Sequence, residues 1–252
     1  MNTVRCTRDG RCGHLVLDRP PLNVLDLPML EALDEAVAGL EEDPSLQCLV
    51  VTGGGDRAFS AGVAVEDHVG DRIAPMLATF HRALKRLFRL PAYTLAAVDG
   101  HCLGGGLEVA AVCDVVLATP RSRFAVPEIR LGCYPPVAAA LLPQRIGWDR
   151  ALELMLTGRT LDAAEAERLG LVTAVVEDLD AAVRERLDAL AAHSTVATRL
   201  TKRAALAAVR NDFERALDEA ERLYLEELTA SRDMHEGIQA FLERREPRWQ
   251  HE

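Results

Sequence analysis

The sequence predicts an α/β protein whose core is a mostly parallel β-sheet covered by helices. Short β-branched runs alternate with segments of helical apolar spacing, and beyond about residue 163 the composition changes to Ala, Leu, Glu and Arg. Alternating strands and helices imply right-handed crossovers, which place helices on the faces of a parallel sheet. A length of 252 residues allows one large domain, or one domain with an appendage.

The first elements read as strand, helix and strand. Residues 14–17 and 48–52 are short apolar runs bounded by glycine, as expected of buried strands. Between them, residues 29–41 carry apolar side chains at helical intervals, including Leu30, Leu33 and Leu40.

The same alternation then repeats. Apolar side chains at Met76, Phe80 and Leu84 predict a helix over 73–90, and the runs 94–98 and 115–118 have strand character. Residues 107–112 form a short apolar segment opened by glycines, which predicts a buried helix.

The last third is predicted to be helical, with one remaining strand over 171–176. A short polar stretch around Ser194 precedes two long amphipathic helices, so we expect a core of residues 1–193 and a helical region of residues 194–252. A final helix over 234–245 carries Ile238, Phe241 and Leu242 on one face, which needs a partner surface.

Composition and charge exclude several classes of protein. The chain is 49% apolar and 27% charged, as soluble globular proteins are, and its formal net charge of −10 argues against a nucleic-acid groove or an anionic membrane surface. No run approaches the roughly 18 apolar residues of a membrane span, and the first residues lack the apolar core of a secretion signal, so we expect a cytoplasmic protein. The six cysteines form no CxxC pair, and no metal site is expected.

A glycine-rich segment around Gly104, Gly105 and Gly106 joins a predicted strand to the buried helix. Glycine lets another molecule approach the main chain closely, and the first amides of a helix have no partner within it, so they can bind an oxygen. For three glycines alone, a tight packing turn between helix and strand is the better explanation. A dinucleotide or ATP loop is disfavoured, because neither the GxGxxG spacing nor a following GK[ST] is present.

A second bare loop, residues 57–63, follows the strand at 48–52. If both loops follow strands of the same parallel sheet, they can supply two main-chain N–H groups to one carbonyl oxygen, which is the geometry of an oxyanion hole.

Two glutamates are candidates for acid–base chemistry. Glu108 lies one helical turn beyond Gly105 and is flanked by apolar residues, a setting that raises the pKa of a carboxyl group. Glu128 follows the strand at 115–118 and a short FAVP segment. Most glutamates are solvated surface acids, but a pair around one water molecule can activate it and deliver a proton.

Six segments, in this order, resemble those of the crotonase (enoyl-CoA hydratase/isomerase) superfamily, and the resemblance runs through almost the whole chain. The segments are LDRPPLNVLD, RAFSAGVAV, AAVDGHCLGGGLEVAAVCDVVLAT, FAVPEIRLG, RALELMLTGRTLDAAEAERLGLVTAVV and EGIQAFLERREPRW. The resemblance implies a crotonase-like spiral of ββα units, a helical C-terminal region used in oligomerisation, and a homo-oligomer that is a trimer or a dimer of trimers.

The same resemblance implies the site residues. The oxyanion-hole amides map onto Val63 and Gly105, and the two hydratase glutamates onto Glu108 and Glu128, which would add water syn to a double bond conjugated to an acyl-CoA thioester or remove it. Coenzyme A is then the carrier of the substrate, and no cofactor or metal is required. Substrate or CoA contacts are expected from Arg19, Asn23, Val24, Ala58, Ser60, Ala61, Gly104, Tyr134 and Pro136.

Two segments depart from the common pattern of the family. Ala64 stands where many members carry an aspartate two places after the Ala-Gly pair, and the segment from Leu131 to Ala139, which contains Pro135 and Pro136, replaces a glycine-rich turn. Prolines stiffen the backbone and predict an acyl pocket of different shape. This segment looks most like the subgroup that hydrates cyclic dienoyl-CoA thioesters such as cyclohexa-1,5-diene-1-carbonyl-CoA. His68 is either a residue of that pocket or a surface residue at a helix start.

Other activities of the superfamily remain open from the sequence. An enoyl-CoA isomerase, a decarboxylase and a dehydratase acting on a carrier-protein thioester would share these motifs. A non-catalytic binding protein with the same fold is the remaining alternative, although retention of both glutamates and all three glycines argues against it.

Overall fold

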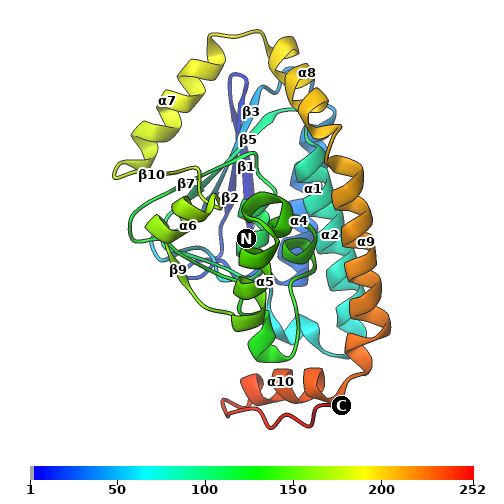
Figure 1. Ribbon diagram of the computed structural model, residues 1–252. Helices are drawn as coiled ribbons and strands as arrows, with labels where there is room; N and C mark the ends of the chain where they lie inside the picture. The colour runs from blue at the N-terminus through cyan, green and yellow to red at the C-terminus, as the bar shows by residue number, and fades with distance from the viewer. Residues whose placement is uncertain (1–2) are drawn as a thin grey trace.

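The computed structural model describes residues 3–252 and has two β-sheets surrounded by helices (Figure 1). The larger sheet has the order β1-β2-β3-β5-β7-β10, and only the β1/β2 pair is antiparallel. Its strands are β1 (Val4–Asp9), β2 (Cys12–Leu17), β3 (Cys48–Gly53), β5 (Tyr93–Val98), β7 (Val115–Ala118) and β10 (Ala174–Val175). The predicted mostly parallel α/β core is confirmed, with β1 as an antiparallel edge strand that the sequence reading did not include.

A second, smaller sheet has the order β4-β6-β8-β9. Its strands are β4 (Ala58–Ser60), β6 (His101–Leu103), β8 (Arg123–Ala125) and β9 (Leu161–Asp162). The chain repeatedly leaves the large sheet, adds one short strand here and continues into a helical turn, which is the ββα repeat expected of the family. The prediction that the two loops follow strands of the same parallel sheet is confirmed, because β4 and β6 pair in parallel. The strands are not those at 48–52 and 94–98, and β4 lies within the segment 57–63 that was read as a loop. Three-residue strands are too short to show a sequence period.

The helices of residues 3–252 are α1 (Leu27–Glu41), α2 (Ile73–Arg89), α3 (Gly105–Ala111), α4 (Pro136–Ile146), α5 (Trp148–Thr157), α6 (Ala163–Leu169), α7 (Leu179–Ala191), α8 (Thr195–Leu206), α9 (Arg210–Glu226) and α10 (Arg232–Leu242). The first three agree with the predicted segments to within two residues and α10 to within three, whereas α4 and α5 were not predicted. Single 3₁₀ turns are η1 (Val65–His68), η2 (Gly70–Arg72), η3 (Pro127–Leu131) and η4 (Leu228–Ala230). None of the helices within residues 3–252 is long and apolar enough to cross a membrane.

Local sequence explains where these helices begin. Asp26 caps α1 by accepting a hydrogen bond from the Met29 amide (3.1 Å), and Pro28 stands in the first turn, where its missing N–H costs nothing. Ser194 caps α8 in the same way. The first helical residue of α3 is Gly105, because Gly104 has a φ of 53° and lies outside the helix.

The main core lies between the sheets and the helices α1 to α4 and α9. The apolar face of α2 that the sequence predicts, including Met76, Phe80 and Leu84, is almost completely buried. Each such side chain contributes about 1.5–3 kcal/mol. A second cluster lies under α7, where Leu95 and Leu117 of the large sheet meet Val183.

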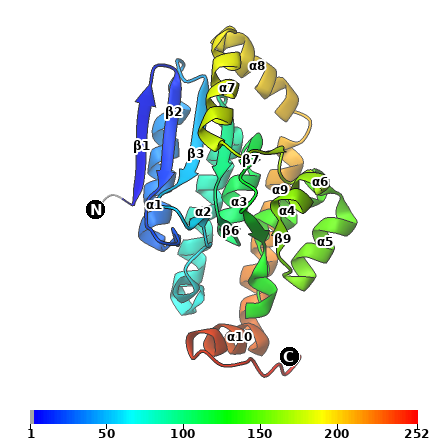
Figure 2. The same cartoon turned by 90° about the vertical axis from the view of Figure 1, so that its left-hand side faces the viewer.

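The C-terminal helices wrap around this core. Helix α9 runs beside α2 and α4, and α10 lies at the end of the molecule farthest from α7 and α8, packed against η1 and η3 (Figures 1 and 2). Ile238 on α10 is buried there, whereas Phe241 remains 56% exposed. The division into a core and a C-terminal oligomerisation region stays a prediction.

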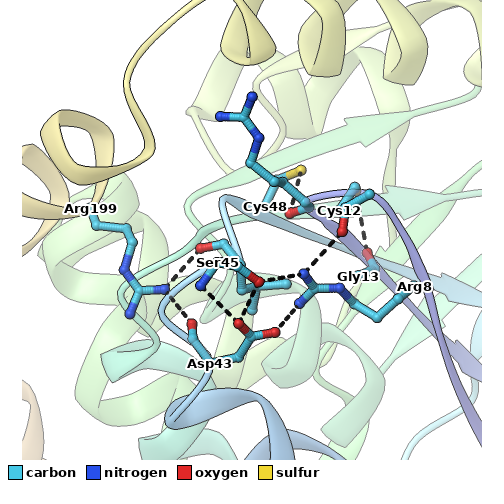
Figure 3. Close-up of polar contacts among 10 residues, drawn as sticks. Arg8, Cys12, Gly13, Asp43, Ser45, Cys48 and Arg199 are labelled. Carbon is cyan, nitrogen blue, oxygen red and sulfur yellow. Dashed lines mark hydrogen bonds and ion pairs between the residues drawn. The ribbon is translucent and has the colours of Figure 1, made fainter.

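Polar contacts fix the loop between α1 and β3 (Figure 3). The Arg8 guanidinium pairs with Asp43 and donates to the Ser45 hydroxyl (3.1 Å). Arg199 of α8 donates to the carbonyls of Asp43 and Leu46, each at 2.8 Å. The start of the C-terminal region is therefore tied to the edge of the large sheet.

Candidate active site

A cavity of about 340 Å³ opens where the loops after β4 and β6 meet α2, α3, η3 and the C-terminal segment. Met76, Leu77 and Phe80 form an apolar wall, and Glu108 and Glu128 supply the acidic groups. Apolar surroundings with a few convergent polar groups are typical of small-molecule sites.

Two main-chain amides belong to the lining of this cavity, those of Val63 and Gly105. A Cβ placed on Gly105 would stand 3.3 Å from the Val63 nitrogen, so the two amides are close neighbours. Gly105 opens α3 and has no carbonyl within the helix to which it can donate, and neither amide donates a hydrogen bond within the described chain. Both N–H groups are therefore unpaired within residues 3–252 and belong to neighbouring residues of the cavity wall.

Glycines at two positions make this arrangement possible. Gly62 has a φ of 100°, and a side chain there would meet the Leu103 carbonyl at 2.9 Å. Gly104 has a φ of 53°, and its bare Cα leaves room for the Glu128 carboxyl, whose Oε1 lies 2.6 Å from where a Cβ would be. A side chain at Gly62 would push the two loops apart, and a side chain at Gly104 would push its loop away from the Glu128 carboxyl group.

Glu108 enters the cavity from the first turn of α3. Its side chain is buried, and Oε1 accepts a hydrogen bond from the Ala138 amide of α4 (2.8 Å). Burial raises the pKa of Glu108 to about 7, against the opposing effect of the amides of Ala138 and Val137. These donors favour the charged form, so Glu108 is the acid of the pair that ionises more readily.

Glu128 enters from η3, immediately after Pro127. Burial, and after it the negative charge of Glu108, raises the pKa of Glu128 to about 8. Its Oε2 is buried and has no hydrogen-bond partner among residues 3–252. Because like charges in one cavity disfavour double ionisation, the pair holds one proton near neutral pH, mainly on Glu128.

The predicted contacts with substrate and CoA divide into three groups. Ala61, Gly104, Tyr134 and Pro136 line the cavity together with the amides and the acids. Arg19 and Val24 line a separate surface groove, where Arg19 pairs with Asp26.

Asn23, Ser60 and Ala58 are engaged within the protein. The fully buried Asn23 amide group donates to the carbonyls of Gly54 (2.9 Å) and Ala58 (2.8 Å), and its Oδ1 accepts from the Arg19 amide (2.9 Å). The Ser60 hydroxyl donates to the Asn23 carbonyl (2.8 Å) and accepts from the Gly62 amide. These residues hold the loop that carries Val63.

Several cavity residues were missed by sequence reasoning. Tyr224 comes from α9, and Phe241 and Arg245 come from the end of the chain. The apolar face expected over 234–245 was a signal for Phe241, but no local signal marked Tyr224. His68, for which two interpretations were open, lines the cavity, and burial lowers its pKa.

Comparison with known proteins identifies the family of this chain. The model of the enoyl-CoA hydratase/isomerase family matches residues 10–252. A cyclohexa-1,5-dienecarbonyl-CoA hydratase of Thauera aromatica is 39% identical over 96% of this chain and 94% of its own length. A probable enoyl-CoA hydratase of Mycobacterium bovis is 37% identical over 99% of this chain and 98% of its own.

Solved structures agree as well. The crystal structure of an enoyl-CoA hydratase from Mycobacterium avium subsp. paratuberculosis superposes with a TM-score of 0.88 at 30% identity, covering 98% of each chain. With the family model spanning nearly the whole sequence and the fold shared throughout, the chain belongs to the enoyl-CoA hydratase/isomerase family, the crotonase superfamily.

Proposed function

We propose that this hydratase-type lyase adds water syn to the 2,3-double bond of a conjugated acyl-CoA thioester, or removes it in the reverse direction. The observation that carries the proposal is that two main-chain amides unpaired within residues 3–252 and two carboxyl groups line one cavity, where Glu108 accepts from the Ala138 amide and Glu128 Oε2 has no partner among those residues.

The amides of Val63 and Gly105 are proposed to bind the thioester oxygen. When water attacks C3, the π electrons move toward the carbonyl and negative charge grows on this oxygen. Two N–H groups at that point bind the transition state more tightly than the substrate, and each such donor is typically worth about 3 kcal/mol.

The two acids divide the proton transfers. Glu108, whose ionised form is favoured by the Ala138 amide, takes a proton from the water as the C3–O bond forms. Glu128, which keeps its proton near neutral pH, delivers it to C2. The net change is addition of H and OH across the double bond, and this chemistry needs neither a metal nor a redox cofactor.

We propose a cyclic dienoyl-CoA, such as cyclohexa-1,5-diene-1-carbonyl-CoA, as the substrate class. Support comes from the 39% identical relative and from the pocket wall, where Cys133, Tyr134, Pro135 and Pro136 line the cavity in succession. Consecutive prolines hold this wall in one shape, which suits a rigid ring better than a flexible chain.

We also propose that the chain assembles as a trimer or a dimer of trimers. Trp148, Leu152 and Leu156 recur at four-residue spacing on α5, and Trp148 is 69% exposed. Such an apolar stripe is typical of an interface between subunits. Light scattering after size-exclusion chromatography would give three or six protomers, and a monomer would contradict the proposal.

The activity is tested by following the loss of absorbance of the conjugated thioester with crotonyl-CoA and with cyclohexa-1,5-diene-1-carbonyl-CoA. We expect hydration of the cyclic substrate to be preferred, and Glu108→Gln and Glu128→Gln to lose at least roughly a hundredfold in rate. A large preference for crotonyl-CoA would contradict the substrate class. Unchanged turnover in either variant would remove that glutamate from the mechanism.

A further inference from the structure

Tyr224 is a buried residue of the cavity wall to which the proposed reaction gives no role. It lies on α9, is 1% exposed, and lines the same cavity as Glu108 and Glu128. Its hydroxyl oxygen is buried and has no hydrogen-bond partner among residues 3–252. Leaving a buried phenol without a partner is costly, and native proteins usually avoid it unless a ligand supplies the partner.

A neighbouring tyrosine shows the contrast. The rings of Tyr134 and Tyr224 pack edge to face with centroids 5.3 Å apart. Tyr134 satisfies its own hydroxyl by donating to the Ala220 carbonyl of α9 (2.6 Å). The pairing therefore fixes the Tyr224 ring while leaving its hydroxyl unused.

The chemical surroundings make Tyr224 a donor. Burial, and after it the nearby Cys133 thiol, raises the pKa of Tyr224 above its usual range, and the Glu128 carboxyl adds to this effect. The phenol therefore keeps its proton at any working pH. The Cys133 thiol lies near the Tyr224 hydroxyl and influences its pKa, but the two atoms do not meet the geometry of a hydrogen bond. Sulfur is a weak acceptor, and the thiol itself donates to the Leu131 carbonyl (3.5 Å).

Within residues 3–252, two buried polar atoms of this cavity thus lack partners, the Tyr224 hydroxyl and Glu128 Oε2. Both residues line the same cavity, and the segment that packs on Tyr224 is held to Glu128 by the Cys133 amide, which donates to the Glu128 carbonyl (3.1 Å). An oxygen atom between them could accept from the phenol and exchange a hydrogen bond with the carboxyl group.

We propose that the Tyr224 hydroxyl donates a hydrogen bond to the oxygen that is added at C3, which is the water before the reaction and the substrate hydroxyl after it. This inference rests on the proposed hydratase function. It makes Tyr224 a third polar contact of the reacting water, supplied by a helix more than 90 residues beyond Glu128 in the chain.

The test removes the proposed donor hydroxyl from the protein and the proposed acceptor hydroxyl from the ligand, and compares the binding affinities. Calorimetric titration would measure the binding of 3-hydroxybutyryl-CoA and butyryl-CoA, which differ only in that oxygen. Both are titrated into Glu108→Gln protein, where turnover is slow, with and without Tyr224→Phe. We expect Tyr224→Phe to weaken binding of the hydroxy ligand about fivefold and to leave butyryl-CoA binding within a factor of two.

A Tyr93→Phe variant is the matched control, because Tyr93 lies on β5 under the α7 and α8 side, outside the cavity. It should leave both affinities unchanged. Equal loss for both ligands, or loss for neither, would overturn the contact. Thermal unfolding provides a second criterion: without a partner in the protein, the Tyr224 hydroxyl can be removed with no loss of Tm, and a clear drop would assign it a structural role.

The two claims fail separately. If the ligand hydroxyl is recognised through Tyr224 but the wild type hydrates no enoyl thioester, the proposed function is wrong and the contact stands. If hydration proceeds but the affinities do not depend on Tyr224 in this way, only the contact is wrong.

Discussion

Replacing Glu128 with glutamine should make the protein less active and more stable. Burial and the Glu108 charge raise the pKa of Glu128 from an ordinary value of 4.5 to about 8. At 1.36 kcal/mol per pH unit, this difference corresponds to about 5 kcal/mol of folding free energy linked to the proton. Glutamine has nearly the same shape and carries no charge at any pH.

The sign of the effect follows from which state binds the proton more tightly. Between pH 4.5 and 8 the folded wild type holds a proton on Glu128 that the unfolded chain has released. This stabilisation is complete below pH 4.5 and is lost as the pH rises through about 8. The stability of Glu128→Gln does not change in this way, so the difference in free energy of unfolding between the variant and the wild type grows as the pH rises toward 8.

The assay is thermal unfolding of both proteins from pH 5 to 9, beside the thioester absorbance assay. For a chain of this length, about 5 kcal/mol corresponds to roughly 10 °C or more in Tm at the alkaline end. Glu31→Gln, at an exposed position on α1, is the control and should follow the wild type. If the Tm curves of Glu128→Gln and the wild type run parallel across this range, Glu128 is not a buried acid of raised pKa.

Three further changes test other parts of the site. The hydration rate of the wild type should peak between pH 7 and 8, because Glu108 is protonated at lower pH and Glu128 ionises at higher pH. In Glu128→Gln the fall in rate at alkaline pH should disappear. A flat profile of the wild type would refute the division of roles. Gly104→Ala should lower kcat by at least roughly tenfold with the circular dichroism spectrum retained, because its Cβ would stand 2.6 Å from Glu128 Oε1; full activity would show that the acid need not lie over this loop. Asn23→Ala should cost more than about 2 kcal/mol in urea unfolding, because it leaves the Gly54 and Ala58 carbonyls unpaired, and an unchanged midpoint would contradict that structural role.

Much of the fold could be predicted because its longer elements carry clear periodic patterns. Helix α2 agrees with the predicted segment to one residue, and β3, β5 and β7 were found as apolar runs. The second sheet could not be predicted, because β4 and β6 have only three residues each. Their pairing depends on the return of the chain from the large sheet, which no local pattern records.

The candidate site shows the same division. Glu108 was a candidate because its neighbours are all apolar, and the structure places it buried beside the free amides of Val63 and Gly105. Tyr224 could not be found in this way. It lies on the apolar face of an amphipathic helix, where side chains that line a cavity and side chains of the core recur at the same helical intervals. Asn23 was expected to contact substrate or CoA, but its side-chain amide donates to the carbonyls of Gly54 and Ala58. Nothing in the sequence indicates that these hydrogen bonds form within the protein.

A crystal structure of the protein with a saturated acyl-CoA bound would test the central claim most directly. The thioester oxygen should lie 2.7–3.1 Å from the nitrogens of both Val63 and Gly105, with C2 and C3 facing Glu108 and Glu128. An acyl-CoA bound with its carbonyl directed away from these two amides would contradict the account.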